Sequence, residues 1–316
     1  MKIYLAGIVQ HGVISENSAS ENYIVQRRQL RTYPFALDSY HYIGYDPRYL
    51  THIRETQRSV FLDSGAFSMF TKGIKVDLSA YADFIKANQD CFHVASNLDV
   101  IGRGAEEETY ANQKALEKMG AAICPVHHAR DADRWLQRYM ADGYDYIFLG
   151  GMVAEPTPYL RGWLDHVWGR YLTRRDGSAK IRVHGFGLTT LELIERYPWY
   201  SVDSTSWILT SRYGGIHVDL PNGRDTKLSI SSDSSAVYQF DRHYDTLSPL
   251  NRGFIDEYIR AQPTGEPPES GLPSHYDPEL LRTHYGWRDH WNIAFFRRLG
   301  ERLNPTFNKR QIDVFD

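Results

Sequence analysis

The sequence predicts an α/β protein built as a closed (β/α)8 barrel, with a β-hairpin inserted after the eighth strand and a helical extension towards the C-terminus. Eight short apolar runs recur along residues 3–203, and stretches with helical spacing or helix-starting residues separate them. Strands that alternate with helices over short connections form a parallel sheet, and eight such units suffice to close a barrel. An open, doubly wound sheet is the alternative.

Each apolar run is expected to be one barrel strand. In chain order the runs are residues 3–8, 40–45, 60–63, 92–98, 122–127, 146–149, 181–186 and 200–203. The intervening segments are expected to be helices. They cover residues 20–30, 47–55, a helix opened by Asp77, 106–119, 131–140, 158–171 and 189–196.

After the eighth run the alternation stops. Residues 215–230 predict a β-hairpin, because Ile216, Val218 and Leu220 alternate with polar residues before a Pro-Asn-Gly turn. Residues 249–262 predict a helix that completes the last unit, residues 262–278 hold five prolines and predict an irregular strap, and residues 280–302 return to helical spacing. We expect one catalytic barrel over 1–262, including hairpin 215–230, with strap and helix 263–316 packed on the same domain.

The composition excludes several classes of protein. The chain has 316 residues, 36 basic and 39 acidic side chains, and a formal charge of −3. Its two cysteines, Cys91 and Cys124, exclude a disulfide scaffold and a cysteine-rich zinc site. With 42% hydrophobic and 14% aromatic residues, disorder is excluded. The first apolar run is too short for a signal peptide and no run approaches about 18 residues, so we expect a soluble, cytoplasmic protein.

Polar residues and glycines gather where the predicted strands end, and in a barrel those ends carry the catalytic groups. They are Asp63, Asp99 and Asp203, three histidines (His127, His128, His184) and four glycines (Gly150, Gly151, Gly185, Gly187). A single aspartate at a strand end is commonly a helix N-cap, and glycines there also serve tight turns. Aspartates on three different strands instead predict a site lined by carboxylates.

Several carboxylates facing one cavity favour chemistry at a sugar carbon through an oxocarbenium-like transition state. One carboxylate attacks the carbon, and another carries a proton to or from the leaving group. Close carboxylates also raise one another's pKa, which supplies the acid form. The other interpretation is a metal-dependent barrel hydrolase that uses His128, His184 and Asp203, although only His11 follows the first run where such enzymes carry a His-x-His pair.

The motifs at the strand ends resemble, in order, those of the tRNA-guanine transglycosylase family. Asp63-Ser-Gly-Ala-Phe-Ser resembles that family's Asp-Ser-Gly-Gly-aromatic-Gln, and Leu149-Gly-Gly-Met-Val-Ala-Glu-Pro156 resembles its Gly-Gly-Leu-Ala-x-Gly-Glu loop. His184-Gly-Phe-Gly-Leu-Thr189 is similar to Met-Gly-Val-Gly-Thr, and Val202-Asp203-Ser-Thr-Ser is similar to the Phe-Asp-Cys of the nucleophile strand. The likeness spans about residues 60–210.

The resemblance implies a TIM barrel that exchanges guanine in a polynucleotide for a 7-deazaguanine by double displacement at C1′. By matching position it implies Asp203 as the nucleophile, Asp63 as the general acid/base and Asp99 as the acceptor of the purine's N–H edge. His127 matches a glutamine that touches the base, Gly150 and Gly151 match the backbone at the exocyclic carbonyl, and Phe67 and His184 match the groups that sandwich the ring. Ser64 and Gly185 complete the implied base-binding set.

The departures from the family bear on the substrate. Members that act on tRNA carry a Cys-x-Cys-x2-Cys…His zinc site after the eighth strand, whereas this chain has no cysteine there and the predicted hairpin occupies the place. The short, zinc-free relatives are phage-type enzymes that insert 7-deazaguanines into DNA. The resemblance therefore implies DNA, flipped-out or single-stranded, and a free 7-deazaguanine as partners, with no cofactor or metal. The same exchange on tRNA and a non-catalytic nucleic-acid-binding subunit are the alternatives.

Two stretches concentrate positive charge although the total is near neutral. Residues 161–182 hold six basic residues, and residues 282–310 hold seven against two acidic ones. Such runs are commonly solvated helix faces, and the other interpretation is contact with phosphate. On the second interpretation we expect phosphate contacts at Arg174, Arg175, Arg212, Arg297 and Arg298. The sequence leaves the oligomeric state open.

Overall fold

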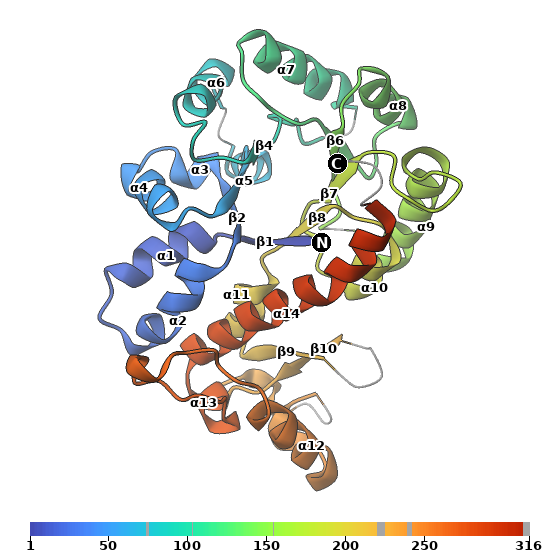
Figure 1. Cartoon of the computed structure of the whole chain (residues 1–316). Coiled ribbons are helices and arrows are strands. Elements are labelled where there is room, and N and C mark those ends of the chain that lie inside the picture. Colours follow the sequence, from blue (N-terminus) through green and yellow to red (C-terminus); the bar gives the residue numbers. More distant parts are fainter. Residues whose placement is uncertain (74–75, 103, 154, 220–224, 239–241, 312–316) are drawn as a thin grey trace. The chain divides into compact units, whose positions relative to one another are not determined.

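The computed structural model describes residues 1–73, 76–102, 104–153, 155–219, 225–238 and 242–311 (Figure 1). The chain divides into two compact units: a barrel unit of residues 1–13, 34–204 and 300–316, and a second unit of residues 14–33 and 205–299. This division differs from the boundary at residue 262 that the sequence suggests. The hairpin and the segments after it do not complete the barrel, because they pack around a core of their own.

The barrel unit contains eight parallel strands in the sheet order β4-β3-β2-β1-β8-β7-β6-β5. The two outermost strands meet through a parallel bridge between Ser96 and Cys124, where the Cys124 N–H donates to the Ala95 carbonyl at 2.9 Å. The ring of strands is therefore closed, and the predicted (β/α)8 barrel is confirmed. The strands are β1 (Lys2–Ala6), β2 (Phe35–Ser39), β3 (Ser59–Asp63), β4 (Val94–Ala95), β5 (Val126–His128), β6 (Tyr146–Gly150), β7 (Arg182–Gly185) and β8 (Ser201–Ser204).

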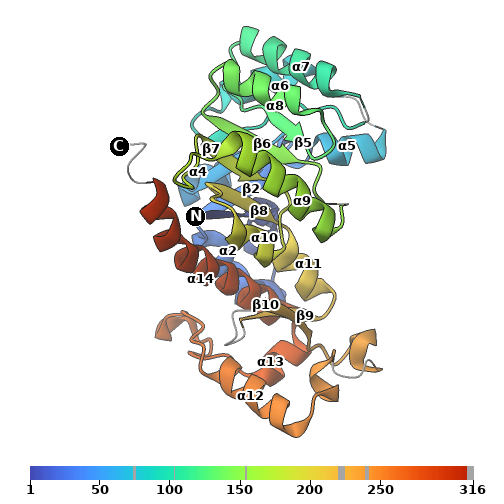
Figure 2. The same cartoon turned by 90° about the vertical axis from the view of Figure 1, so that its right-hand side faces the viewer.

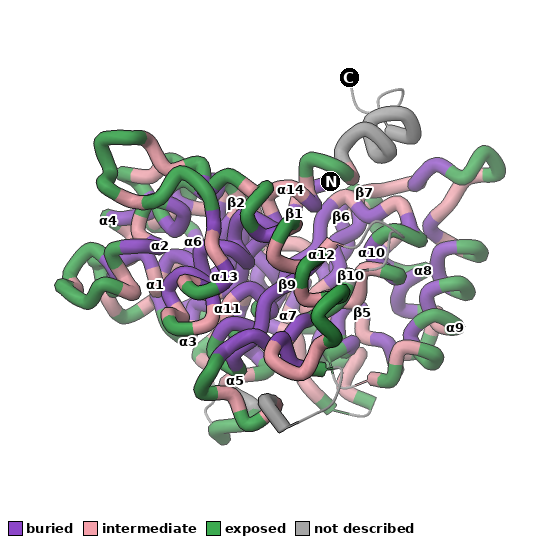
Figure 3. The backbone as a smooth tube through the Cα atoms, turned by 90° about the horizontal axis from the view of Figure 1, so that it is seen from below, coloured by how far each residue is buried: buried purple, intermediate pink, exposed green. Residues whose placement is uncertain are grey.

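Helices follow the strands of this unit, although the sequence does not predict those at residues 8–16, 40–43 and 66–72. The caps explain where several of the helices begin. The Asp77 carboxylate accepts the N–H groups of Ser79 and Ala80, and Asp46 does the same for Arg48. The helices are α1 (Ile8–Glu16), α3 (Tyr40–Ile43), α4 (Pro47–Thr56), α5 (Ala66–Lys72), α6 (Leu78–Ala87), α7 (Glu106–Lys118), α8 (Asp133–Ala141), α9 (Thr157–Val167) with a π-helical turn η1 (Trp168–Leu172), and α10 (Leu191–Arg196). Helices α8 and α9 alternate buried and exposed positions (Figure 3).

The predicted second strand is wrong. Residues 40–43 form helix α3, and the strand lies just before them at Phe35–Ser39, where it pairs with β3 from Phe35↔Ser59 to Ser39↔Asp63. The Ser39 hydroxyl accepts the His41 N–H and so caps the helix. A buried aspartate, Asp38, interrupts the apolar pattern of the true strand and hides it. Its carboxylate accepts the Val9 N–H at 3.0 Å, which fixes the start of α1.

Aromatic and aliphatic side chains fill the inside of the barrel. Tyr4, Leu37, Phe61 and Phe148 belong to one buried cluster. Paired residues of neighbouring parallel strands share a face, and side chains along a strand alternate between faces. Starting from this cluster, pairing and alternation show which residues of each strand face the interior. The same count extends to the residues at the carboxyl ends of the strands.

The second unit contains α2 (Glu21–Thr32), α11 (Ser206–Arg212), the antiparallel hairpin β9 (Gly215–Asp219) and β10 (Asp225–Ser229), α12 (Pro249–Arg260), α13 (Pro278–Thr283) and the first part of α14 (Tyr285–Gln311). The predicted hairpin is confirmed, although its Pro-Asn-Gly turn lies outside the described residues. The core of the second unit includes Val25, Ile216, Val218, Trp287 and Trp291. The strap expected at 262–278 is irregular apart from the short turn η4 (Pro268–Ser270) and an isolated antiparallel bridge between Pro263 and His275.

Candidate active site

The carboxyl ends of the barrel strands bring the predicted aspartates together. Asp203 pairs with Tyr4, and Asp63 stands two residues beyond Phe61 on β3. Since Tyr4 and Phe61 face the interior, both aspartates face it too. Asp99 follows β4, and its charge and that of Asp203 both act on Asp63. The three carboxylates therefore occupy one end of the barrel.

Asp203 is held by one oxygen only. Oδ1 accepts the N–H of Gly187 at 2.8 Å and lies 3.2 Å from Nε2 of His184. Within the described residues Oδ2 has no hydrogen-bond partner, and the residue is 5% exposed. A carboxylate fixed through one oxygen with the other unengaged is arranged to act as a nucleophile.

Asp63 is set up as an acid. Burial, followed by the negative charges of Asp99 and Asp203, raises its pKa to about 7, although the Gly65 and Ser64 N–H groups oppose the shift. The Gly65 N–H lies 3.1 Å from Oδ2. A carboxyl group with this pKa is partly protonated at neutral pH and can give or take a proton.

Asp99 is engaged at both oxygens. Oδ2 lies 2.8 Å from Nε2 of His128, and Oδ1 accepts the Ser64 hydroxyl at 3.4 Å. Burial disfavours the imidazolium form of His128, but the hydrogen bond and charge of Asp99, together with the charge of Asp131, outweigh it and raise the pKa of His128. The Asp131 carboxylate also accepts the His128 N–H at 2.8 Å. His128 and Asp99 thus form a largely buried, charge-assisted pair.

The predicted base contact at His127 is not part of this cluster. Its ring is fully buried and stacks on Trp163 of α9, with 6.3 Å between centroids and 27° between planes. Neither ring nitrogen has a hydrogen-bond partner among the described residues, and burial lowers the pKa of His127 to about 4. Because neighbours along a strand face opposite sides, His127 faces the helices and His128 faces the site.

His184 lies inside the barrel beneath the carboxyl ends of the strands, and its buried ring offers no face to a ligand. It is fully buried, 4.6 Å from the Phe61 ring and 4.9 Å from the Phe186 ring. Its two nitrogens contact Ser201 and Asp203. Phe67 is 62% exposed on the first turn of α5 and offers the aromatic face that His184 does not.

The four glycines have different roles. A Cβ at Gly150 would lie 2.9 Å from the His128 ring, so this glycine makes room for His128. Gly151 follows it with φ +69° and is exposed. Gly185 packs against Trp199 on the helix side, where a Cβ would lie 3.1 Å from the indole. Gly187, with φ +61°, supplies the N–H to Asp203.

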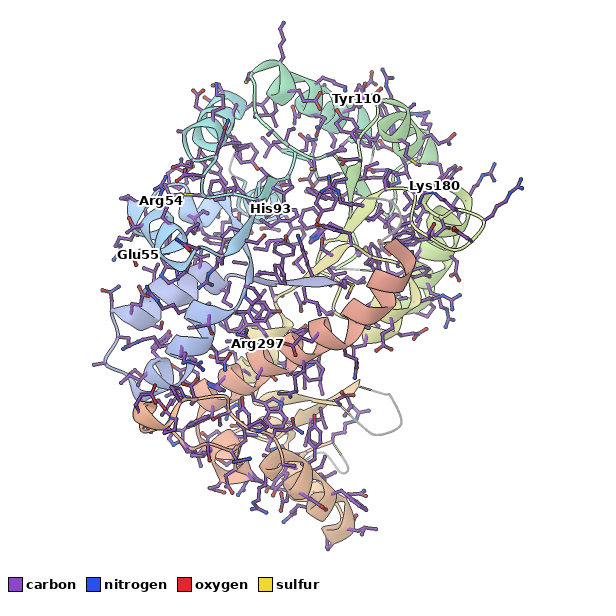
Figure 4. The ribbon with its side chains drawn as sticks, viewed as in Figure 1. Arg54, Glu55, His93, Tyr110, Lys180 and Arg297 are labelled. Atoms are coloured by element: carbon purple, nitrogen blue, oxygen red, sulfur yellow. The ribbon has the colours of Figure 1, made fainter. Side chains whose placement is uncertain are left out.

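The basic residues of 161–182 include two that lie away from the carboxylates. Arg174 and Arg175 belong to the loop that leads into β7, at the amino-terminal end of the strands. The Arg174 guanidinium donates to the carbonyls of Ala179 and Lys180 within that loop. Figure 4 labels Lys180 in this loop and His93 in the segment that leads into β4. Neither arginine therefore forms part of the site at the carboxyl ends.

The other three predicted phosphate contacts belong to the second unit. Arg212 lies 3.5 Å from the Asp289 carboxylate and over the Tyr285 ring. Arg297 donates to the side chains of Gln29 and Thr32, and Arg298 lies over the Trp291 ring. Each guanidinium is thus engaged within that unit.

Sequence reasoning missed His128 as the inward-facing histidine, and it also missed Ser201 and the N–H of Gly187. Strand alternation counted from Val126 selects His128, but it requires the pairing of Val126 with Phe148, which the structure supplies. Within the described ranges, no three His, Cys, Asp or Glu residues are grouped so that they could hold a metal ion. Likewise, no helix in those ranges is long and apolar enough to cross a bilayer.

Comparisons with known proteins yield a distant structural similarity. No protein-family model matches the chain, and no curated protein matches it either. Among solved structures it is similar to a protein from Coccidioides immitis described as a "putative fructose-1,6-biphosphate aldolase", with 13% identity and a TM-score of 0.41 over 66% of this chain and 75% of that one.

Proposed function

We propose that the protein is a transglycosylase that exchanges guanine in DNA for a free 7-deazaguanine base through a covalent intermediate on Asp203. The observation that carries the proposal is the pairing of two unlike carboxylates. Asp203 has a free oxygen, and Asp63 has a pKa raised to about 7. A nucleophile beside a proton donor is what double displacement at a glycosidic carbon requires.

The first half-reaction breaks the bond between C1′ and N9 of guanine. Oδ2 of Asp203 attacks C1′, and Asp63 donates its proton to the leaving guanine, which departs as the neutral base. In the second half, Asp63 takes the N9 proton of the incoming 7-deazaguanine, N9 attacks C1′, and the ester bond to Asp203 breaks. Atoms and charges balance, and Asp63 ends protonated as it began.

Base recognition is assigned to the cluster around Asp99. The Ser64 hydroxyl and His128 orient the Asp99 carboxylate. A purine N–H edge would donate to the same carboxylate oxygens alongside these two residues. The exposed Phe67 ring supplies a stacking face. A guanine in duplex DNA must leave the stack to reach a site inside a barrel rim, so the substrate is flipped-out or single-stranded DNA. We place this activity in the cytoplasm, that of the host if the gene is carried by a phage.

The test is base exchange. Purified protein is incubated with guanine-containing single- or double-stranded DNA and a labelled 7-deazaguanine, in parallel with tRNA. We expect label in DNA and a trapped covalent DNA adduct with the wild type. Asp203→Asn should give neither, because an amide is too poor a nucleophile. Absence of label in any DNA would overturn the proposal, and label in tRNA alone would transfer the same chemistry to RNA.

A further inference from the structure

A lysine that contacts two side chains of a neighbouring helix ends α5, the helix that follows Asp63. Lys72 is the last residue of α5, the helix that starts three residues after Asp63. Its Nζ lies 3.0 Å from Nε2 of His41 and 5.2 Å from the centre of the Tyr42 ring. His41 and Tyr42 belong to α3, so the lysine joins the helices that follow β2 and β3.

The turn after Asp63 fixes the place of this pair. At Gly65, which has φ +81°, a Cβ would lie 2.3 Å from the Ser39 hydroxyl and 2.8 Å from Cβ of His41. The start of α3 therefore packs directly on the segment that leads from Asp63 into α5. In Figure 2, α5 lies on the opposite side of the barrel unit from the N-terminus, which agrees with its origin at the carboxyl end of β3.

Among the described residues, no acidic side chain compensates the charge of Lys72. Burial, and then the charge of Lys72, lowers the pKa of His41, so the imidazole is neutral and accepts one ammonium N–H at Nε2. In the described part of the chain no carboxylate pairs with Lys72. Arg130 in the loop after β5 provides the contrast, since Glu155 binds its guanidinium with two hydrogen bonds.

We infer that Lys72, held by His41 and Tyr42, forms a subsite for a phosphate group of the substrate strand. An exposed ammonium fixed by a neutral acceptor and an aromatic ring keeps its other N–H groups for an anion from solution. Lys72 stands five residues after Phe67 on α5, which corresponds to about 7.5 Å of helical rise. Five residues also turn about 140° around the helix axis, so a strand whose base stacks on Phe67 would have to follow the surface of α5 to bring one of its phosphates to Lys72. The inference rests on the proposed function, because it takes the anion to be a phosphodiester.

Binding is the first test, because it does not depend on exchange. A fluorescently labelled, single-stranded, guanine-containing DNA 12-mer is titrated with the wild type, Lys72→Ala and Lys180→Ala, and anisotropy is followed at several salt concentrations. We expect Lys72→Ala to weaken binding about three- to tenfold and to reduce the slope of log K against log salt by about 0.7, the value for one phosphate on a single strand. The matched control Lys180→Ala removes the same charge at the amino-terminal end of the barrel and should behave as the wild type. Equal affinity and slope for Lys72→Ala and the wild type, or no binding by the wild type, would overturn the inference.

Exchange kinetics separate this inference from the proposed function. If the wild type exchanges bases, Lys72→Ala should raise KM for DNA several-fold with kcat nearly unchanged, because the lysine holds a part of the substrate that does not react. If the wild type binds the 12-mer through Lys72 but exchanges nothing, the proposed function fails and the subsite stands. A mononucleotide that competes with the 12-mer for the wild type but not for Lys72→Ala would support the subsite and identify a phosphomonoester as a further ligand.

Discussion

Nε2 of His184 lies 3.2 Å from Oδ1 of Asp203, and the other ring nitrogen lies 2.7 Å from the Ser201 hydroxyl. That hydroxyl is also 2.6 Å from the hydroxyl of Tyr146. Burial lowers the pKa of His184 although Asp203 opposes the shift, so the ring is neutral. Tyr146 then donates to Ser201, Ser201 donates to Nδ1, and Nε2–H donates to Asp203. This buried chain selects the tautomer that donates to Asp203, the proposed nucleophile.

Ser201→Ala removes the donor that selects this tautomer. We expect kcat for base exchange to fall roughly tenfold, because a single hydrogen bond between neutral groups is worth about 0.5–1.5 kcal/mol. The free energy of unfolding should also fall by about 1–3 kcal/mol, since the Tyr146 hydroxyl is left buried without its partner. Steady-state exchange and chemical denaturation measure the two effects.

The double variant Ser201→Ala with Tyr146→Phe serves as the control for that prediction. Removing the orphaned hydroxyl should recover much of the lost stability while the rate stays low. A rate that recovers together with the stability would mean that the chain only supports the fold and does not orient Asp203.

The barrel and the three aspartates could be predicted because their signals are local. Asp63 and Asp203 each end an apolar run, Asp99 closes another, and parallel strands bring such ends to one edge. The strand at Phe35–Ser39 could not be found in this way, because the buried Asp38 breaks its pattern and finds its partner at Val9, far away in sequence. The aromatic run after it looked more like a strand and is a capped helix.

The choice between His127 and His128 shows a second limit. The two side chains face opposite sides of the sheet, and the apolar run that ends there does not fix the register. Only pairing with β6, where His128 stands opposite Gly150, settles which ring faces the site. The second unit could not be recognised either, because its core joins residues 14–33 to residues 205–299, and no local pattern links them.

The rate of exchange should depend on pH through Asp63. Burial and the charges of Asp99 and Asp203 raise its pKa to about 7, so the acid form that protonates the leaving base dominates below that pH and is lost above it. We expect kcat/KM to fall with rising pH above about 7, by about tenfold per unit. Asp63→Asn should lower the rate by about 10²–10⁴-fold and abolish this limb. An alkaline limb that persists in Asp63→Asn would assign the proton to another group.

Substitution of His128 should alter KM for the incoming base, whereas substitution of His127 should not. His128→Ala removes the partner of Asp99, and a charge-assisted hydrogen bond is worth about 1.5–3 kcal/mol, so KM for the incoming base should change by roughly 10–100-fold. His127→Phe should leave KM unchanged and preserve or raise stability, because an apolar ring suits the stack on Trp163 better than one with two unpartnered nitrogens. Measured KM values for a 7-deazaguanine decide the matter. An effect of His127→Phe as large as that of His128→Ala would place both rings in base recognition.

Gly187→Ala tests the backbone donor to Asp203. At φ +61° an alanine is strained by about 1 kcal/mol, and its Cβ would lie 2.5 Å from Cγ2 of Val153. Either the exposed Val153 side chain or the loop must shift, and we expect the strained loop to carry the Gly187 N–H away from Oδ1. We expect a roughly 10–100-fold loss in kcat, because hydrogen bonds to charged groups are worth about 1.5–3 kcal/mol.

Gly177→Ala is the matched control. Gly177 also has positive φ, +85°, but it lies in the loop before β7, and a Cβ there meets no atom within 4 Å. Both variants should lose stability through the strain at positive φ, Gly187→Ala at least as much because it also meets Val153, and only Gly187→Ala should lose rate. Equal rates for both would show that the nucleophile does not depend on the Gly187 N–H.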